Sequence, residues 1–398
     1  MRKLTFASLV AIALLALSVA WEAPQEVSPE TERVVNAYNE FGFRVFKQLT
    51  LPAAQANVFI APSSIAVALT IAYNGAAGET KKAMAKTMAL LGIPDKDVNS
   101  ANLELRRLFG KLEAKTELLS ANALWLRKGV EFRKEFLSLS RKFFDAEIAP
   151  LTTAKAINDW VARKTKGKIA HLVDRIDPLI VLVITNAVYF KGLWQKQFDK
   201  RLTKPEDFHL PTGRKIKVPM MSQSGKFLYL RGEGFQAVCL PYGETGRLRF
   251  YLFLPDKGKS LADFLRTLNR ENWERWIAGF KTMDGDVKMP RFKVEYGTVS
   301  LKEPLSTMNM AIAFDRKRAD FSGICSGIRV WIDDVLHKAF VEVNEEGTEA
   351  AAATAVPMPG LALPPKERFN LIADHPFFFA IRDSLTGLVL FMGILNKP

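Results

Sequence analysis

Apolar residues in the first half of the chain recur every three or four positions, the period of a helix that buries one face. The clearest such stretch follows Ser28 and Pro29, a capping residue and a proline at the first helical position. Its apolar face is formed by Val34, Val35, Tyr38, Phe41, Val45, Phe46 and Leu49. Further helical stretches begin near residues 62, 81, 101, 132 and 157. The pattern predicts a mainly helical first half.

Shorter apolar runs, of strand length, follow in the second half. Residues 181–190 are apolar almost throughout, which predicts a central strand buried on both faces. The other candidate strands are 121–127, 249–254, 338–343, 369–372, 377–382 and 388–395, the last two joined as a hairpin. Helices followed by strands indicate an α+β fold. Because no repeat, long charge block or Gly/Ser-rich linker interrupts the chain, we expect one domain over residues 30–398.

The first residues carry a different pattern. A positively charged start precedes an apolar stretch over residues 4–19 and a group of small residues that ends at Ala20. This pattern is typical of a secretory signal peptide over residues 1–20, with Ala23 as a second candidate cleavage position. An uncleaved membrane anchor is the alternative, although the apolar run is shorter than the ~20 residues that a spanning helix needs. We therefore expect a secreted protein, extracellular or periplasmic.

The chain is basic, with 56 Lys and Arg against 42 Asp and Glu and a net charge of +14. A basic surface attracts polyanions, but acidic residues stand among the basic ones and no nucleic-acid-binding motif accompanies them. We expect no specific nucleic acid partner, and weak polyanion binding is left open. The two cysteines, Cys239 and Cys325, form no metal-binding pattern, and their spacing leaves both the paired and the free state open. No cofactor is expected.

An exported enzyme would need catalytic motifs. The sequence contains no Gly-x-Ser-x-Gly, no His-Glu-x-x-His and no phosphate-binding Gly-rich loop. The nearest pattern, at 323–327, has Cys325 where a nucleophilic serine would stand, and the chain has only four histidines. A hydrolase that uses Cys325 and His337 is kept as a distant alternative. We expect that the protein is not an enzyme.

One stretch, residues 345–365, fits neither a helix nor an ordinary strand. It is rich in alanine and carries prolines at 357, 359, 364 and 365. Proline interrupts helices and central strands alike. The stretch lies between the candidate strands 338–343 and 369–372. It is therefore either an exposed loop or a segment that adopts two conformations.

Residues 347–355 resemble the hinge of the reactive-centre loop in inhibitory serpins. Further segments match the family in the right order, from about residue 30 to the C-terminus. They are 57–66, 185–194, 335–339, 374–379 and 391–393. The resemblance implies the serpin fold, a single domain of about eight or nine helices and three β-sheets. It also implies an exposed reactive-centre loop at about 345–365.

The resemblance implies a suicide-substrate mechanism. A serine protease cleaves the loop and forms an acyl-enzyme, and the freed loop inserts into the central sheet as a new strand before the ester is hydrolysed. The hinge residues are Gly347, Thr348, Glu349, Ala350, Ala351, Ala352, Ala353 and Thr354. Alternate side chains of a strand face opposite ways, and the inward set is Thr348, Ala350, Ala352, Thr354, Val356 and Met358. The early inward residues are small and uncharged, as fast insertion requires.

The length of the loop locates the cleaved bond. Fifteen residues, counted inclusively from Gly347, reach Leu361, so the reactive bond joins Leu361 and Ala362. The bonds after Met358 and Leu363 are poor alternatives because proline follows each of them. A leucine before the cut favours chymotrypsin-, elastase- or subtilisin-like proteases over trypsin-like ones. The expected product is a covalent 1:1 complex with a monomeric inhibitor.

The family pattern gives roles to six further residues. Ser64, Asn186 and His337 would lie beneath the central strands where the sheet opens. Insertion would begin near Trp194, Arg291 and Glu345, and we expect Arg291 and Glu345 to form an ion pair.

Two features depart from the family pattern. Ala61 stands where many members have a serine, so the opening region lacks one hydroxyl. Pro357 and Pro359 fall late in the inserting segment, where they would raise the fraction of loop cleaved as plain substrate. A non-inhibitory serpin used for carriage, chaperoning or storage is the alternative function.

Overall fold

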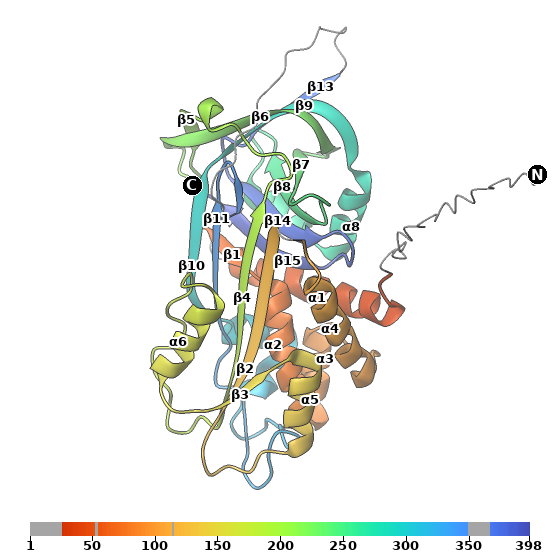
Figure 1. Ribbon diagram of the computed structural model, residues 1–398, viewed down its shortest axis with the longest axis vertical. Helices are drawn as coiled ribbons and strands as arrows, with labels where there is room; N and C mark the ends of the chain where they lie inside the picture. The colour runs from red at the N-terminus through yellow and green to blue at the C-terminus, as the bar shows by residue number, and fades with distance from the viewer. Residues whose placement is uncertain (1–25, 52–54, 114, 349–366) are drawn as a thin grey trace, which may run out of the picture.

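The computed structural model describes residues 26–51, 55–113, 115–348 and 367–398 (Figure 1). The α-helices of this part of the chain are α1 (Pro29–Thr50), α2 (Pro62–Gly75), α3 (Gly78–Thr87), α4 (Asp95–Phe109), α5 (Lys134–Phe144), α6 (Ala154–Lys164), α7 (Leu261–Thr267), α8 (Arg270–Gly279) and α9 (Lys302–Leu305). The start of α1 follows from its sequence, because the Ser28 hydroxyl accepts the Thr31 N–H. None of these helices is long and apolar enough to cross a bilayer.

A six-stranded sheet runs through the middle of the molecule. Its strands lie in the order β10 (Phe292–Ser300), β11 (Leu336–Val343), β12 (Gly347–Thr348), β4 (Leu182–Leu193), β2 (Thr116–Leu126) and β3 (Glu147–Pro150). All neighbours are antiparallel except β2 and β3. In the described part of the chain β12 holds only Gly347 and Thr348, and no other described strand lies between β4 and β11.

The other strands form one nine-stranded network. They are β1 (Val58–Ile60), β5 (Lys204–His209), β6 (Lys215–Gly232), β7 (Phe235–Pro241), β8 (Leu248–Pro255), β9 (Lys281–Pro290), β13 (Arg368–Ile372), β14 (Phe377–Asp383) and β15 (Val389–Leu395). The long strand β6 belongs to both halves of this network. Its first residues pair with β5 and β9, which continue to β13, and its last residues pair with β7, which continues to β8, β14, β15 and β1. The three sheets expected from the family are therefore the six-stranded sheet and these two parts.

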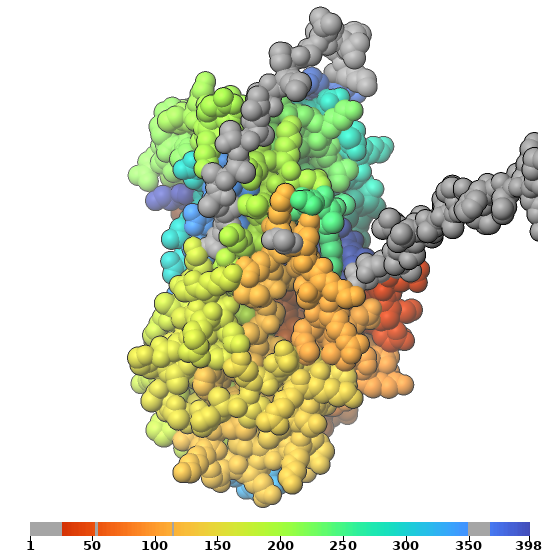
Figure 2. Space-filling model, viewed as in Figure 1, coloured from red at the N-terminus to blue at the C-terminus, as the bar shows by residue number. Residues whose placement is uncertain are grey.

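The two faces of the six-stranded sheet are covered by different helices. Ala123 and Trp125 of β2 pack with Ile157 and Trp160 of α6 in a small cluster on one face. Leu124, between them, belongs to the main core on the other face, where α2 packs against β4. The lower half of the face seen in Figure 2 is formed by α5, α6 and the chain around them.

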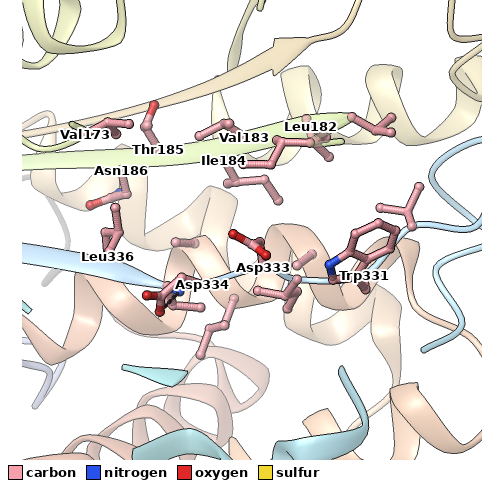
Figure 3. A pocket seen from close by; sticks show the side chains of 18 of the residues that line it. Val173, Leu182, Val183, Ile184, Thr185, Asn186, Trp331, Asp333, Asp334 and Leu336 are labelled. Atoms are coloured by element: carbon pink, nitrogen blue, oxygen red, sulfur yellow. Dashed lines mark hydrogen bonds between the residues drawn. The ribbon is translucent and has the colours of Figure 1, made fainter. Parts of the chain in front are cut away.

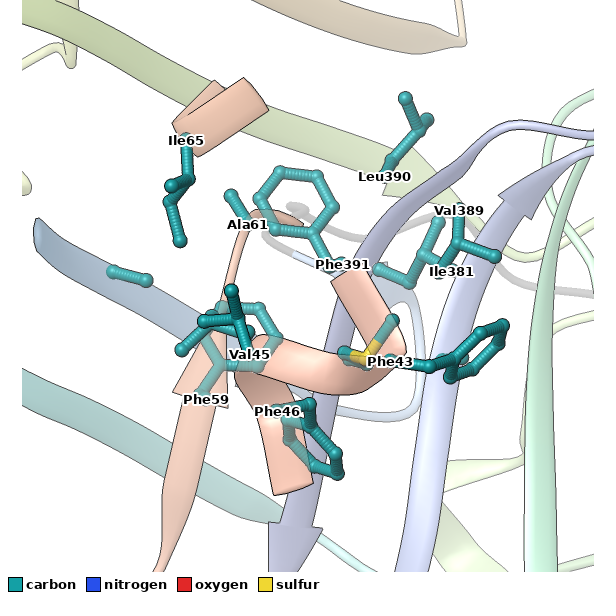
Figure 4. Packing of buried hydrophobic residues seen from close by; sticks show 14 of the residues in the cluster. Phe43, Val45, Phe46, Phe59, Ala61, Ile65, Ile381, Val389, Leu390 and Phe391 are labelled. Carbon is teal, nitrogen blue, oxygen red and sulfur yellow. The ribbon is translucent and has the colours of Figure 1, made fainter. Parts of the chain in front are cut away.

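The main core joins α1 and α2 to the nine-stranded network. Figure 4 shows Phe43, Val45 and Phe46 of α1 beside Phe59 of β1 and Phe391 of β15. The Phe59 ring is stacked on Phe391, with ring centroids 5.6 Å apart. Burying large aromatic side chains of this kind is the main favourable contribution to folding here.

The prediction for residues 181–190 was wrong in one respect. Residues 182–184 of β4 are half-buried rather than buried on both faces, and from Thr185 to Val188 buried and half-buried residues alternate. Among the described residues, only Gly347 and Thr348 pair with β4 on its β11 side, so the lower part of β4 has no described neighbour there. Its apolar side chains therefore border a cavity instead of a packed strand.

Candidate functional site

The first residues of the alanine-rich stretch already belong to the six-stranded sheet. Gly347 and Thr348 form β12, in which Thr348 lies opposite Val343 of β11 and Gly192 of β4. The expectation of a loop exposed from residue 345 onward was therefore wrong for its first four residues, all of which are buried. The reason lies in contacts that these residues make with distant parts of the chain.

Glycine is required at position 347 for two reasons. Its φ is +152°, a conformation that other residues rarely adopt. A Cβ atom built on Gly347 would also collide with the backbone of Gly192 and Leu193 in β4. The close approach of these two backbones is what allows β12 to pair with β4.

The Thr348 side chain points into the core. It is 2 % exposed, and its Oγ1 lies 2.7 Å from the Tyr242 hydroxyl. The Tyr242 ring is stacked on Trp194, with centroids 4.5 Å apart. The Trp194 indole Nε1–H donates to the Asn344 carbonyl, and its backbone N–H donates to the Glu346 carbonyl. These contacts hold both sides of the turn that leads into β12.

Two glutamates in that turn are buried and paired. Glu345 accepts hydrogen bonds from Arg291 (2.6 Å) and from Thr203 Oγ1 (2.7 Å). Burial works against ionisation of Glu345, but these hydrogen bonds outweigh it and hold its pKa below the ordinary value. Glu346 pairs with Lys200 through one oxygen, and its other oxygen has no partner in the described residues.

Lower in the sheet, Ser64, Asn186 and His337 lie near one another but do not form a single chain of hydrogen bonds. The Ser64 hydroxyl donates to Asn186 Oδ1, which ties α2 to β4. His337 Nε2 instead accepts the backbone N–H of Ala61, at 3.1 Å. This contact needs no hydroxyl at position 61. Burial lowers the pKa of His337 to about 4, so the ring is neutral at physiological pH.

A cavity of about 220 Å³ lies between β4 and the start of β11 (Figure 3). It lies further along these two strands than the residues that pair with β12. One wall is β4, from Leu182 to Asn186, and the facing wall is the segment 331–337 that leads into β11. In Figure 3 side chains from both walls face this space. The floor is α2, and most of the lining is apolar. The cavity therefore has the position and chemistry of a place for one more strand.

Some of the expected site residues lie outside the described part of the chain. These are Glu349, Ala350, Ala351, Ala352, Ala353, Thr354, Leu361 and Ala362, together with the signal peptide over residues 1–20. Sequence reasoning also missed Lys200, Thr203 and Tyr242. They contact Thr348 of the hinge or the two glutamates before it, from positions more than 100 residues away along the chain, and no local pattern marks them.

The geometry does not support a hydrolase built on Cys325 and His337. The Cys325 sulfur faces the Ile328 carbonyl, whereas His337 Nε2 is occupied by Ala61. Burial raises the pKa of the Cys325 thiol, which disfavours the reactive thiolate. Cys239 and Cys325 are both buried and unpaired. Among the described residues, no group of His, Cys, Asp and Glu could hold a metal ion.

Comparison with known proteins agrees with this geometry. Residues 36–398 match the family described as Serpin (serine protease inhibitor). An uncharacterised serpin-like protein of Thermococcus kodakarensis is 39% identical, over 92% of this chain and 86% of its own. Leukocyte elastase inhibitor A of Rattus norvegicus is 34% identical, over 92% and 100%. The crystal structure of the thermophilic serpin tengpin in its native state superposes with a TM-score of 0.85 at 28% identity, over 94% and 96%. The chain therefore belongs to the serpin family.

Proposed function

We propose that this serpin is an inhibitor that traps a serine protease as a covalent acyl-enzyme by inserting its cleaved loop between β4 and β11. One observation carries the proposal: a two-residue strand, β12, is already hydrogen-bonded between β4 and β11, and an apolar cavity continues the same line. The first step of insertion is complete in the intact chain. Insertion then continues from Thr348 along the same two strands.

The register of β12 gives the destination of each later residue. Continued without a bulge, the pairing of Thr348 with Val343 and Gly192 puts Thr354 opposite His337 and Asn186. Val356 and Met358 would then fall beside Ile184 and Leu182, in the cavity below β12. The inserting segment therefore reaches the apolar space with its bulkier apolar residues.

The same register separates inward from outward positions. Ala350 would lie opposite Phe190 and Val341, which are both buried. Ala351 would lie opposite Tyr189 and Phe340, on the other face. Three lysines stand over those two rings: Lys166 over Tyr189, and Lys168 and Lys293 over Phe340. A charged side chain is therefore excluded at position 350. An acidic side chain at position 351 would instead be stabilised by the nearby lysines.

Hydrogen bonds alone would not drive insertion. Each new backbone bond stabilises by about 1 kcal/mol, while ordering each residue costs about 1–2 kcal/mol. Filling the cavity and repacking β4 against a new neighbour supply the remaining free energy. Pro357 and Pro359 each lack a backbone N–H donor, so the last part of the inserted strand contributes the least free energy.

The proposed reactive bond joins Leu361 and Ala362. A leucine side chain fits the apolar specificity pocket of chymotrypsin-, elastase- or subtilisin-like proteases, and the relative from rat is named as an elastase inhibitor. The test is to mix the protein with each of these enzymes and with trypsin, and to run denaturing gels. We expect a band that survives boiling in detergent, at the mass of the protease plus the inhibitor chain up to Leu361, and a released peptide that begins at Ala362. Clean cleavage without that band would favour a carrier, chaperone or storage serpin.

A matched pair of variants tests the inserting register. We expect Ala350→Glu and Ala351→Glu to be cleaved at the same rate as the wild type. Ala350→Glu should lose at least 100-fold in covalent complex per cleavage, because an ionised carboxylate facing Phe190 and Val341 costs several kcal/mol. Ala351→Glu should inhibit normally. If both variants inhibit, or neither does, the proposed register is wrong.

We also propose that the chain is secreted after cleavage of residues 1–20. The support is the sequence pattern alone. The mature protein is then expected to begin at Trp21, and mass spectrometry of the exported product checks this. A product that retains its first residues would favour the membrane-anchor alternative.

A further inference from the structure

A second cavity, of about 300 Å³, lies where β6 separates from β7. Beyond the pair formed by Leu228 and Cys239, β6 leaves β7 and continues along β9. The space between them is bordered by three cationic side chains, Lys196, Lys226 and Arg249. None of the residues that line it is an aspartate or a glutamate.

The three cations have no acidic partner in the described residues. Lys196 donates to the Ser224 carbonyl at 2.6 Å, and Arg249 Nε donates to the Gly246 carbonyl at 3.0 Å. The nearby carboxylates are engaged elsewhere: Glu244 pairs with Lys115, and Asp286 is bound by Ser224 and Arg368. Asp284 lies opposite Lys226 in the β6–β9 register, but no ion pair joins them. The three cations of the cavity therefore form no ion pair within the described residues, although Asp284 lies beside Lys226.

We propose that this cavity binds the oxyanion group of a small molecule, either a phosphate or a cluster of carboxylates. Charge-assisted hydrogen bonds from lysine and arginine to such groups are about twice as strong as neutral ones. A concave site lined by one sign of charge also raises the local concentration of the counter-ion. The polar side chains of Gln195 and Thr282, which border the same space, suit the uncharged part of the ligand.

The cavity lies next to the residues that hold Thr348. The Gln195 N–H donates to the Pro241 carbonyl at 2.8 Å, and both residues border the cavity. Their neighbours in sequence are Trp194 and Tyr242, the stacked pair that holds Thr348. A bound oxyanion therefore contacts the two segments that seat β12. Any effect on inhibition rests on the proposed function, whereas the binding itself does not.

Isothermal titration of the intact chain tests the site directly, with pyrophosphate as the phosphate probe and citrate as the carboxylate probe. We expect 1:1 binding of at least one probe, weakened at least tenfold in the double variant Lys196→Gln/Lys226→Gln. The matched control Lys96→Gln/Lys317→Gln loses the same charge from exposed lysines elsewhere and should bind as the wild type does.

A long sulfated polysaccharide serves as a third probe, because it reports general attraction to the basic surface. Its affinity should fall equally in both double variants. Absence of binding by both small probes would overturn the proposal. So would equal weakening in the two double variants, because the small anions would then respond only to the overall charge of the chain.

Discussion

The upper and lower ends of the space between β4 and β11 are built differently. At the upper end β12 is paired on both sides, and polar contacts from Tyr242, Arg291 and Lys200 fix the turn above it. At the lower end no strand of the described residues lies between β4 and the segment 331–337, and the walls are mostly apolar. The upper end therefore fixes where a strand starts, and the lower end holds the unfilled volume that a longer strand would occupy.

This difference assigns separate tasks to the two ends. Contacts at the upper end set the register, because a one-residue slip would turn every inward side chain outward. The lower end supplies driving force, because apolar surface that borders a cavity lacks the contacts of a packed core. Variants at the two ends should accordingly change different properties of the inhibitor.

The largest effect is expected at the upper end, from Thr348→Arg. The residue is buried against Tyr242, so a guanidinium there costs several kcal/mol and should remove β12 from the sheet. We expect unchanged cleavage of the loop and a loss of covalent complex of at least 100-fold. The control Thr348→Ser keeps the hydroxyl and should inhibit normally. Normal inhibition by the arginine variant would refute the role given to this position.

A smaller effect is expected from pH, through His337 near the lower end. Its pKa is about 4 in the folded chain and about 6.5 when unfolded. Below pH 6.5 the unfolded chain binds a proton at His337 that the folded chain does not bind. The free energy of unfolding therefore falls as the pH drops from 6.5 towards 4. Between pH 7 and 4.5 the loss is roughly 2–3 kcal/mol.

Denaturant unfolding at the two pH values measures this loss. The variant His337→Gln retains an acceptor for the Ala61 N–H but cannot be protonated in this range. The other three histidines and all carboxylates are unchanged in it, so the difference between the two proteins isolates His337. Identical pH dependence in the two proteins would contradict the assignment.

The smallest effect is expected from filling the cavity with Ala68→Leu. Ala68 of α2 borders the cavity, and three added carbons should stabilise the intact form by about 1–2 kcal/mol. They would also occupy space that Val356 and Met358 need, so the rate of complex formation should fall several-fold. Ala311→Leu, at an exposed position, is the control. Equal rates for the two variants would mean that the cavity plays no part in insertion.

Local signals in the sequence predicted much of the fold. Ser28 and Pro29 placed the start of α1, because caps depend on neighbouring residues. The run of phenylalanines at 377–379 predicted β14 from its apolar length alone. The candidate site was foreseen through resemblance to the family rather than through any such pattern.

Contacts between distant residues could not be predicted in this way. A two-residue strand is too short to leave a periodic pattern, and Gly347 is required by Gly192, which lies far from it in sequence. From the sequence alone, Glu345 and Glu346 would be expected at the surface. The fold brings Arg291, Thr203 and Lys200 into contact with them. Half-burial of residues 182–184 likewise depends on what lies beside β4 on its β11 side, which comes from a distant part of the chain.

The central claim is that the intact chain is short of its most stable arrangement and reaches it by adding a strand below β12. Calorimetric melting of the intact chain and of the chain cleaved between Leu361 and Ala362 tests this claim most directly. Insertion of about ten residues as a strand and filling of the cavity should raise the midpoint on the order of 20 °C in the cleaved form. Equal midpoints for the two forms would contradict the account.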